Sequence, residues 1–391
     1  MRLETEKYDN RIREIKRDLH RHPEISFREY RTTRVIKQEL ESLGIELLDL
    51  KLDTGAVALL RGKKQGPLIA LRADIDALQL KEETGAPDAS ENPGVMHGCG
   101  HDLHTASLLG AAMILSDMRE ELCANVLFIF QPAEEITAGA QLMLNHGLFE
   151  KYKPDMLFGI HNVPELPVGT AGVKLGALMS AKNNFSIKIT GVGGHGALPH
   201  TTRDPIVCAA SVINSVQSIV SRNVDPRDPA VLSVCSIHAG TQDNLIVDEL
   251  TMTGSIRALS DGVMQTAIER LNDIVRSTAK AYGCGAEVMF NGGPPALVND
   301  ESMYRIAKTA AEKVLGPDGV MDIRPSMGSE DFAVFMKHVS GFFYFLGSGS
   351  RTRENYPWHS GRFQPDEDYL AIAAQLYAQS VLCSMQKPLS L

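Results

Sequence analysis

Three short apolar runs alternate with a helical pattern in the first half of the sequence, and this alternation restricts the fold to a few classes. The runs, at 68–71, 126–130 and 156–160, have the length of buried strands, and a helical pattern at 105–119 separates the first two. Strands that alternate with helices form largely parallel sheets covered by helices on both faces. The sequence therefore predicts an α/β fold.

The pattern changes in the middle of the chain, where strand and helix patterns follow in the order β-α-β-β-α-β. This order is typical of a ferredoxin-like α+β sandwich. Its segments are 185–190, 204–221, 231–237, 250–256, 261–282 and 286–290. After Pro294 and Pro295 the α/β pattern resumes, so we expect an α/β domain formed by 1–180 and 293–391, with an inserted α+β domain at 181–292.

Composition and charge exclude several function classes. The formal net charge of −9 argues against a phosphate-backbone binder, which needs a basic face. No run approaches the ~20 apolar residues of a membrane span, and the start of the chain lacks the apolar stretch of a signal peptide. Six irregularly spaced cysteines do not indicate a disulfide framework. We therefore expect a cytoplasmic protein with neither a nucleic-acid nor a membrane partner.

Polar side chains follow each of the three predicted strands. The first run leads to Asp74 and Asp76, the second to Glu134 and Glu135, and the third to His161. In open α/β sheets, ligands sit beyond the carboxyl ends of the strands. The sequence therefore predicts a functional site at one edge of the sheet.

Two of these segments carry side chains suited to metal chemistry. Cys99 and His101 stand two residues apart in a glycine-rich loop before a helical pattern, so their thiolate and imidazole can share a metal centre. Glu134 and Glu135 cannot point the same way, so one can bind a metal while the other faces the substrate water. A histidine-rich surface loop and a solvated acidic turn are the alternatives.

Further candidates are weaker when each is taken alone. A lone histidine at a strand end, such as His161, is more often structural, and His359 says little by itself. His195 lies in a glycine-rich loop, which suits a donor that approaches a substrate closely. Asn244 and Arg257 have recognition chemistry, and Arg257 could hold a carboxylate through two hydrogen bonds. A surface role is the alternative for each.

Taken together, these segments resemble the aminoacylase and carboxypeptidase family of dinuclear metallopeptidases. The resemblance is closest to its amidohydrolase branch, which includes hippurate hydrolase, indole-acetyl-amino-acid hydrolases and N-acetyl-diaminopimelate deacetylase. It covers nearly the whole chain, in the segments 18–24, 72–78, 97–105, 132–135, 159–162, 191–200 and 328–332 and at His359. It implies a zinc-peptidase-like catalytic domain, mostly a parallel sheet flanked by helices, with an inserted lid domain through which the protein forms a homodimer.

The resemblance also implies roles for individual residues. Five residues bind two divalent metal ions, with the first of them bridging: Cys99, His101, Glu135, His161 and His359. Glu134 matches the general base, Asp76 matches an aspartate that orients a ligand, and the equivalent of His195 reaches the active site of the partner subunit. Asn244 and Arg257 are candidates for binding the substrate. Zinc and manganese are the metals of relatives, and the thiolate and imidazoles also suit cobalt or nickel.

The function expected on this basis is hydrolysis of the amide bond of N-acyl amino acids, which are small-molecule substrates. A hydroxide that bridges the metals would attack the carbonyl, because the cations lower the pKa of water toward ~7, and Glu134 would take the proton. A dipeptidase or carboxypeptidase of the same family is the alternative. A catalytically inactive binding dimer is disfavoured because all five predicted ligands are present.

Overall fold

The structure is a computed structural model that describes residues 6–385 of the 391. By its internal contacts the chain divides into two units. The first unit holds the residues up to 176, 298–324 and those from 334 onward, and the second unit holds 177–297 and 325–333.

The first unit is built on a large sheet whose centre is parallel. Within the described residues this sheet has eight strands in the order β1-β2-β4-β3-β5-β16-β6-β15. The four central strands, β4, β3, β5 and β16, are all parallel to one another. This confirms the predicted largely parallel sheet. The bounds are β1 Glu46–Leu48, β2 Ala56–Leu60, β3 Leu68–Asp74, β4 Asn125–Gln131, β5 Met156–Pro167, β6 Ala171–Gly172, β15 Val320–Met321 and β16 Gly341–Gly349.

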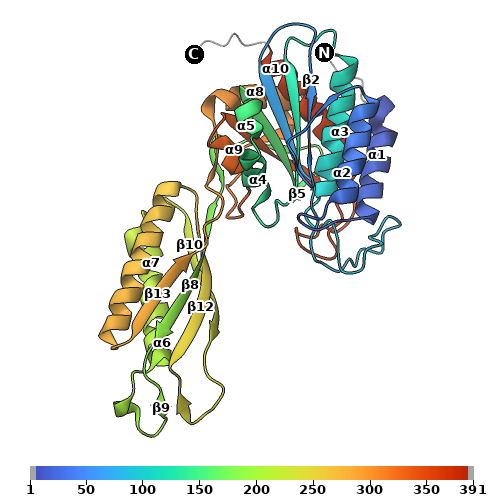
Figure 1. Cartoon of the computed structure of the whole chain (residues 1–391). Helices are drawn as coiled ribbons and strands as arrows, with labels where there is room; N and C mark the ends of the chain where they lie inside the picture. The colour runs from blue at the N-terminus through green and yellow to red at the C-terminus, as the bar shows by residue number, and fades with distance from the viewer. Residues whose placement is uncertain (1–5, 386–391) are drawn as a thin grey trace. The chain divides into compact units, whose positions relative to one another are not determined.

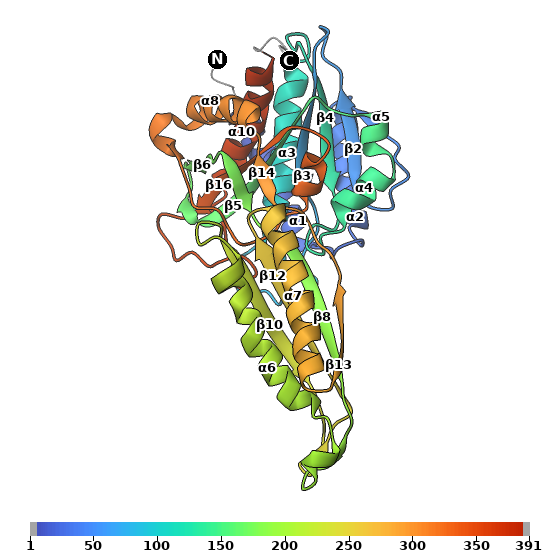
Figure 2. The same ribbon diagram turned by 90° about the vertical axis from the view of Figure 1, so that its left-hand side faces the viewer.

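Helices cover both faces of this sheet. Helices α3 and α10 pack against each other and against the central strands, with α1 beside them, and α4 packs on β4 from the other face (Figures 1 and 2). The apolar core lies between these layers. The bounds are α1 Glu6–Arg21, α2 Tyr30–Ser42, α3 His101–Asp117, α4 Gly139–Asn145, α5 Leu148–Lys151, α8 Glu301–Leu315, α9 Phe332–Met336 and α10 Tyr369–Ser384.

Two elements extend further than the sequence pattern indicated. Helix α3 begins at His101 instead of residue 105, because Gly100 turns the chain at φ +84° immediately before it. Strand β5 continues to Pro167, because its pairing with β16 runs past Asn162. His161 therefore lies inside a strand rather than at a strand end, and His101 belongs to a helix rather than to a loop.

The second unit is an antiparallel sheet with two helices. Its strand order is β10-β12-β8-β13, and each neighbouring pair is antiparallel. The Asp204 side chain caps α6 by accepting the backbone N–H groups of Ile206 and Val207. This order and these helices confirm the ferredoxin-like α+β sandwich. The bounds are β8 Ala181–Thr190, α6 Pro205–Ser218, β10 Ala230–His238, β12 Glu249–Ala258, α7 Asp261–Ala281 and β13 Gly285–Phe290.

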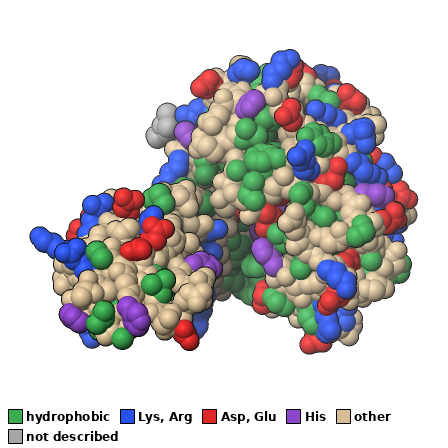
Figure 3. Space-filling view, turned by 60° about the horizontal axis from the view of Figure 1, so that its bottom comes forward, with side chains coloured by type: hydrophobic (Ala, Val, Ile, Leu, Met, Phe, Trp, Pro, Cys, Tyr) green, Lys and Arg blue, Asp and Glu red, His purple; other side chains and the backbone are tan. Residues whose placement is uncertain are grey.

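Short elements complete the description. Strands β9 and β11 pair with each other, as do β7 and β14. Between residues 6 and 385, no helix combines the length and the apolar character needed to cross a bilayer. All six cysteines lie in the described part of the chain and are free. Figure 3 shows acidic and basic side chains interspersed over the visible face. The short strands are β7 Gly176–Met179, β9 Gly194–His195, β11 Leu245–Ile246 and β14 Leu297–Asn299.

Candidate metal centre

The turn between Cys99 and His101 requires glycine at position 100 for two reasons. Gly100 has φ +84°, and a Cβ at this position would lie 2.5 Å from Nδ2 of Asn162. A side chain would therefore meet both backbone strain and a steric clash. Cys99 and His101, on either side of this turn, are both buried in the first unit.

Asp76 orients His101 from just beyond the carboxyl end of β3. Its Oδ1 lies 3.1 Å from Nδ1 of His101, and its Oδ2 accepts hydrogen bonds from Ser26 Oγ at 2.7 Å and from the backbone N–H of Glu135 at 3.1 Å. A carboxylate at Nδ1 leaves the Nε2 atom of the imidazole for a metal. Among the described residues, this buried Nε2 has no hydrogen-bond partner.

The paired carboxylates follow β4 in a constrained turn. Ala133 has φ +53°, a conformation that a residue with a side chain rarely adopts, and its N–H donates to Glu29 Oε1 at 2.9 Å. Glu135 Oε1 lies 3.8 Å from His101 Nε2, and Glu135 Oε2 lies 3.4 Å from His359 Nε2. The turn therefore places Glu135 between two predicted ligands that come from distant segments.

The other predicted ligands reach the same place from β5 and from a loop near the C-terminus. His161 donates from Nδ1 to the carbonyl oxygen of Asn162 at 2.8 Å, and its Nε2 lies 3.6 Å from Cys99 Sγ. His359 has φ +61° and a side chain that is 56% exposed, so it closes the group on the solvent side.

The spacing of these atoms suits metal coordination. Two nitrogen or oxygen ligands at about 2.1 Å from a tetrahedral metal are separated by about 3.4 Å, and a sulfur ligand widens this slightly. Potential ligand atoms lie within 4.8 Å of one another in the group Cys99, His101 and His161, and likewise in the group Cys99, Glu135 and His359. Cys99 is common to both groups, which is where a bridging ligand would lie. The donor set therefore fits two divalent cations.

The electrostatics of the group favour bound cations. Burial, reinforced by the Glu135 carboxylate, raises the pKa of the Cys99 thiol well above its usual value. Burial also raises the pKa of Glu135, although His101 opposes the effect. Burial lowers the pKa of His161 well below its usual value, so its imidazole is neutral. A neutral imidazole binds metal directly, and cations would supply the positive charge that the thiolate and carboxylate need.

Glu134, the predicted general base, is buried beside this group. It is 7% exposed, and a carboxylate oxygen of Glu134 lies within 4.8 Å of the potential ligand atoms of His101 and Glu135. Proton transfer requires a base within hydrogen-bond reach of the water that it activates, directly or through one further water. This placement suits that task.

Sequence reasoning placed Asp74 at a strand end but missed its buried partners, Arg72 and His104, which form a polar chain beside the predicted ligands. Arg72 Nη1 donates to Asp74 Oδ2 at 2.7 Å, and His104 Nδ1 donates to Asp74 Oδ1 at 2.6 Å. His104 Nε2 accepts the backbone N–H of Asn162 at 3.0 Å. The spacing of three residues between His101 and His104 was the available signal, because such residues share a helix face.

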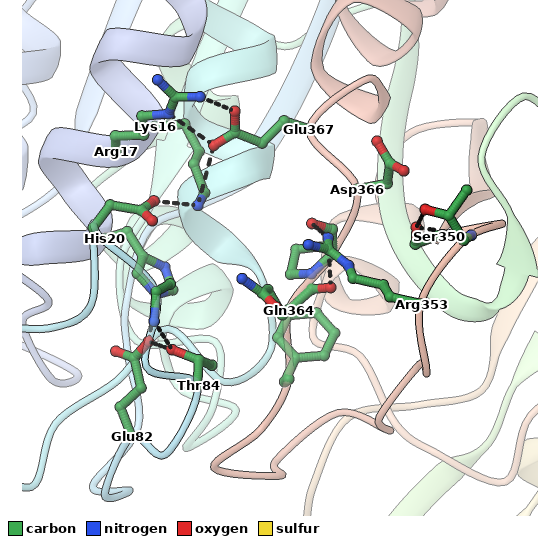
Figure 4. A pocket seen from close by; sticks show the side chains of 15 residues that line it. Lys16, Arg17, His20, Glu82, Thr84, Ser350, Arg353, Gln364, Asp366 and Glu367 are labelled. Carbon is green, nitrogen blue, oxygen red and sulfur yellow. Dashed lines mark hydrogen bonds and ion pairs between the residues drawn. The ribbon is translucent and has the colours of Figure 1, made fainter.

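A second polar network supports the same segment from α1. His20 Nδ1 donates to Asp102 Oδ2 at 2.8 Å, and Lys16 Nζ donates to Asp88 at 2.9 Å. Figure 4 shows the adjoining cavity, of about 360 Å³, in which Lys16 and Arg17 point toward Glu367. Arg353 on the cavity wall instead donates to the backbone carbonyl oxygens of Gln364 and Pro365.

Three predicted residues belong to the second unit. His195 lies on β9, directly opposite Leu245 of β11, and its exposed ring accepts the N–H of Ala197 at 3.0 Å. Asn244 is exposed in a loop, and Arg257 donates to the carbonyl of Met327 at 2.9 Å. The structure thus brings together Asp76, Glu134 and the five predicted ligands in the first unit, whereas these three residues lie on the other unit.

Comparison with known proteins agrees with this description. The peptidase family M20/M25/M40 matches residues 70–382. The chain is 42% identical over 373 residues to an N-acetylcysteine deacetylase of Bacillus subtilis strain 168, covering 95% of this chain and 96% of that relative. It is 36% identical over 387 residues to thermostable carboxypeptidase 1 of Saccharolobus solfataricus, covering 96% and 97%.

The solved structures include a close match. A Bacillus subtilis protein described as a dinuclear metal binding peptidase from the M20 family superposes with a TM-score of 0.87 at 38% identity, over 98% of this chain and 99% of that one. The resemblance that the sequence motifs suggested is therefore confirmed, and the chain belongs to the peptidase family M20/M25/M40.

Proposed function

We propose that the protein is a dinuclear metal-dependent amidohydrolase that releases the acyl group from N-acyl amino acids. The observation that carries the proposal is that five donor side chains form two groups, each compact enough to hold a cation. The two groups share Cys99, and Glu134 lies beside them. The similarity to an N-acetylcysteine deacetylase supports this substrate class.

Each residue at the site would have a separate task. When bound, the two cations supply Lewis-acid chemistry, since they acidify a water and polarise the amide carbonyl. Glu134 would take the proton from the attacking water and pass it to the leaving amine. Cys99 and Glu135 would provide the anionic charge that holds the cations, and Asp76 would keep His101 in the metal-binding tautomer. Zinc suits the thiolate and imidazoles, and manganese is the other candidate.

The second unit would complete the substrate site. His195 would donate to the oxyanion, and Asn244 and Arg257 would grip the substrate or its free carboxylate. In this proposal the unit acts as a lid and as the contact of a cytoplasmic homodimer, so that His195 serves the partner subunit. His195 supports this role because its imidazole is exposed on the short β9–β11 ribbon, where another molecule can contact it.

A dipeptidase or carboxypeptidase is the second candidate function. It is favoured by the 36% identity to a thermostable carboxypeptidase over almost the whole of both chains. The two activities use the same metal centre and base, and they differ in what lies on the acyl side of the amide bond.

One screen separates these functions. Purified protein would be offered N-acetyl amino acids, hippurate and dipeptides, before chelation, after chelation, and after zinc or manganese is restored. We expect hydrolysis of N-acyl amino acids that is lost on chelation and recovered with metal. Preferred hydrolysis of dipeptides would favour the second function, and turnover that survives removal of all metal would refute both.

A further inference from the structure

Asn162 connects three of the segments that carry predicted metal ligands. It follows His161 on β5 and is completely buried. Its amide Nδ2 donates to the carbonyl oxygen of Cys99 at 2.6 Å. Its own backbone carbonyl accepts from His161 Nδ1 at 2.8 Å and from Trp358 Nε1 at 3.1 Å. Trp358 precedes His359 in the chain. Asn162 is therefore hydrogen-bonded to Cys99, to His161 and to the neighbour of His359.

The hydrogen bond to Cys99 fixes the tight metal-binding turn. Gly100 follows Cys99, and the place of its missing side chain is 2.5 Å from Asn162 Nδ2. The amide is held in turn by Ser348 Oγ, which donates to Asn162 Oδ1 at 3.1 Å. The side chain therefore has one orientation that satisfies its partners, and in that orientation it holds the carbonyl of Cys99.

The bond to Trp358 fixes the segment that carries His359. The indole ring of Trp358 packs edge-on against His161, with ring centroids 4.9 Å apart. The backbone of His359 has φ +61°, a strained conformation that persists only where the surrounding structure holds it. The indole N–H bonded to Asn162 is a neighbouring contact that can impose it.

The backbone carbonyl of Asn162 also sets the chemistry of His161. Because Nδ1 of His161 donates its proton to this carbonyl, Nε2 carries the lone pair that faces Cys99 Sγ at 3.6 Å. A shift of the Asn162 backbone would move the imidazole and the indole together.

We propose that Asn162 is a positioning residue of the metal centre, whose amide and carbonyl hold Cys99, His161 and the His359 segment in coordinating geometry. This inference rests on the proposed metal centre. Removal of such outer hydrogen bonds typically costs ~10- to 100-fold in metal affinity, and we expect a loss of this size for Asn162→Ala.

The chain offers a matched control in Asn299. This residue is 2% exposed, and its amide bonds the backbone of Lys174 and Phe343 at 2.7–3.0 Å. Asn299→Ala therefore removes a comparable buried amide from the same unit without touching the Cys99 carbonyl. A purely structural role of Asn162 predicts similar metal retention in the two variants.

The experiment measures metal release from the full-length holoprotein. The wild type, Asn162→Ala and Asn299→Ala would be dialysed against increasing concentrations of a chelator, and bound metal would be counted by elemental analysis. Trp358, the single tryptophan of the sequence, adds a fluorescence signal from the site itself. We expect Asn162→Ala to lose metal at ~10- to 100-fold lower chelator concentration than the wild type, and Asn299→Ala to match the wild type.

Two results would overturn the inference: wild-type metal retention in folded Asn162→Ala, or an equal loss in Asn299→Ala. If Asn162→Ala does not fold, Trp358→Phe decides, because it deletes the indole N–H and keeps an aromatic ring. Weaker retention in Trp358→Phe supports the inference, and wild-type retention contradicts it. A wild-type protein that binds no metal would instead refute the proposed function, so the two failures are distinguishable.

Discussion

The carboxylate of Asp76 joins two predicted metal ligands, because Oδ1 lies 3.1 Å from Nδ1 of His101 and Oδ2 accepts the backbone N–H of Glu135 at 3.1 Å. Asp76→Ala would leave the orientation of the His101 ring unfixed. It would also leave the backbone N–H of Glu135 without its acceptor. We therefore expect metal affinity to fall ~10- to 100-fold. Isothermal titration of the chelator-treated protein with zinc measures this. Ser26→Ala, which removes only one donor to Asp76, is the control and should change affinity far less.

Glu134 and Glu135 are neighbours with different expected roles, so they form a natural pair of variants. Glu134→Gln should keep both metals and lose ~100- to 10,000-fold in turnover, because it removes the base and not a ligand. Glu135→Gln should lose metal first and activity as a consequence. Metal content and initial rates measured on the same preparations separate these outcomes. A Glu134→Gln enzyme with wild-type turnover would eliminate the assigned base.

Cys99 is the ligand shared by the two candidate cation groups. Cys99→Ser keeps the shape of the side chain but replaces a soft thiolate by a hydroxyl, so we expect both cations to bind more weakly. Elemental analysis after dialysis gives the number of metals retained per chain. Unchanged metal content would count against a bridging thiolate. Gly100→Ala should weaken binding as well, because its Cβ would meet Asn162 Nδ2 at 2.5 Å.

The sequence predicted the secondary structure well where the apolar pattern was strong. Helices α3, α6 and α7 and the central strands β3, β4 and β5 were located, because each buries an apolar stripe or run. The antiparallel strand β2, Ala56–Leu60, which lies between β1 and β4, was missed because no helix separates it from its neighbours in the alternating pattern. The start of α3 was missed because residues such as His101 and Asp102 do not show an apolar pattern.

The candidate site could be predicted only in part for a related reason. Motifs identified the residues with metal chemistry, but the distances among them depend on how β3, β4, β5 and the loop before α10 meet. Asp74 and His104, for example, are buried where these segments meet and hydrogen-bond to each other there. Asn162 lies in the motif 159–162, but the sequence did not indicate its role, because a buried asparagine beside a histidine differs from a surface one only through its partners in the fold.

The pKa of His20 makes part of the stability depend on pH. Burial alone would lower this pKa, but the Asp102 carboxylate 2.8 Å away and the Glu82 side chain raise it from 6.5 to about 9. A raised pKa means that the folded state binds the proton more tightly than the unfolded state. The stabilisation is therefore complete below about pH 6.5 and disappears as the pH rises through about 9.

Urea unfolding of the chelator-treated protein tests this dependence. Between about pH 6 and about pH 9.5 we expect the free energy of unfolding to fall by roughly 1–3 kcal/mol through His20. His20→Gln should show a smaller fall over the same range. His22→Gln is the control, because its side chain is 32% exposed and lies outside the Asp102 network. A pH dependence that His20→Gln leaves intact would mean that another group is responsible.

His195 provides a test of whether the active site is shared between subunits. In the proposed dimer, the first unit of one chain supplies Glu134 and the second unit of its partner supplies His195. His195→Ala and Glu134→Ala should each be nearly inactive, since loss of one oxyanion donor typically costs ~100- to 1,000-fold and loss of a general base ~100- to 10,000-fold. In a mixed dimer of the two variants, however, one of the two sites contains both intact residues.

Unfolding and refolding the two variants together should therefore restore activity. Random assortment makes about half of the dimers mixed, and each has one working site, so about a quarter of the wild-type activity is expected. Differently tagged chains allow the mixed dimers to be isolated and their rates measured. The variants refolded separately show the background, and verified mixed dimers that remain inactive would mean that each subunit uses its own His195.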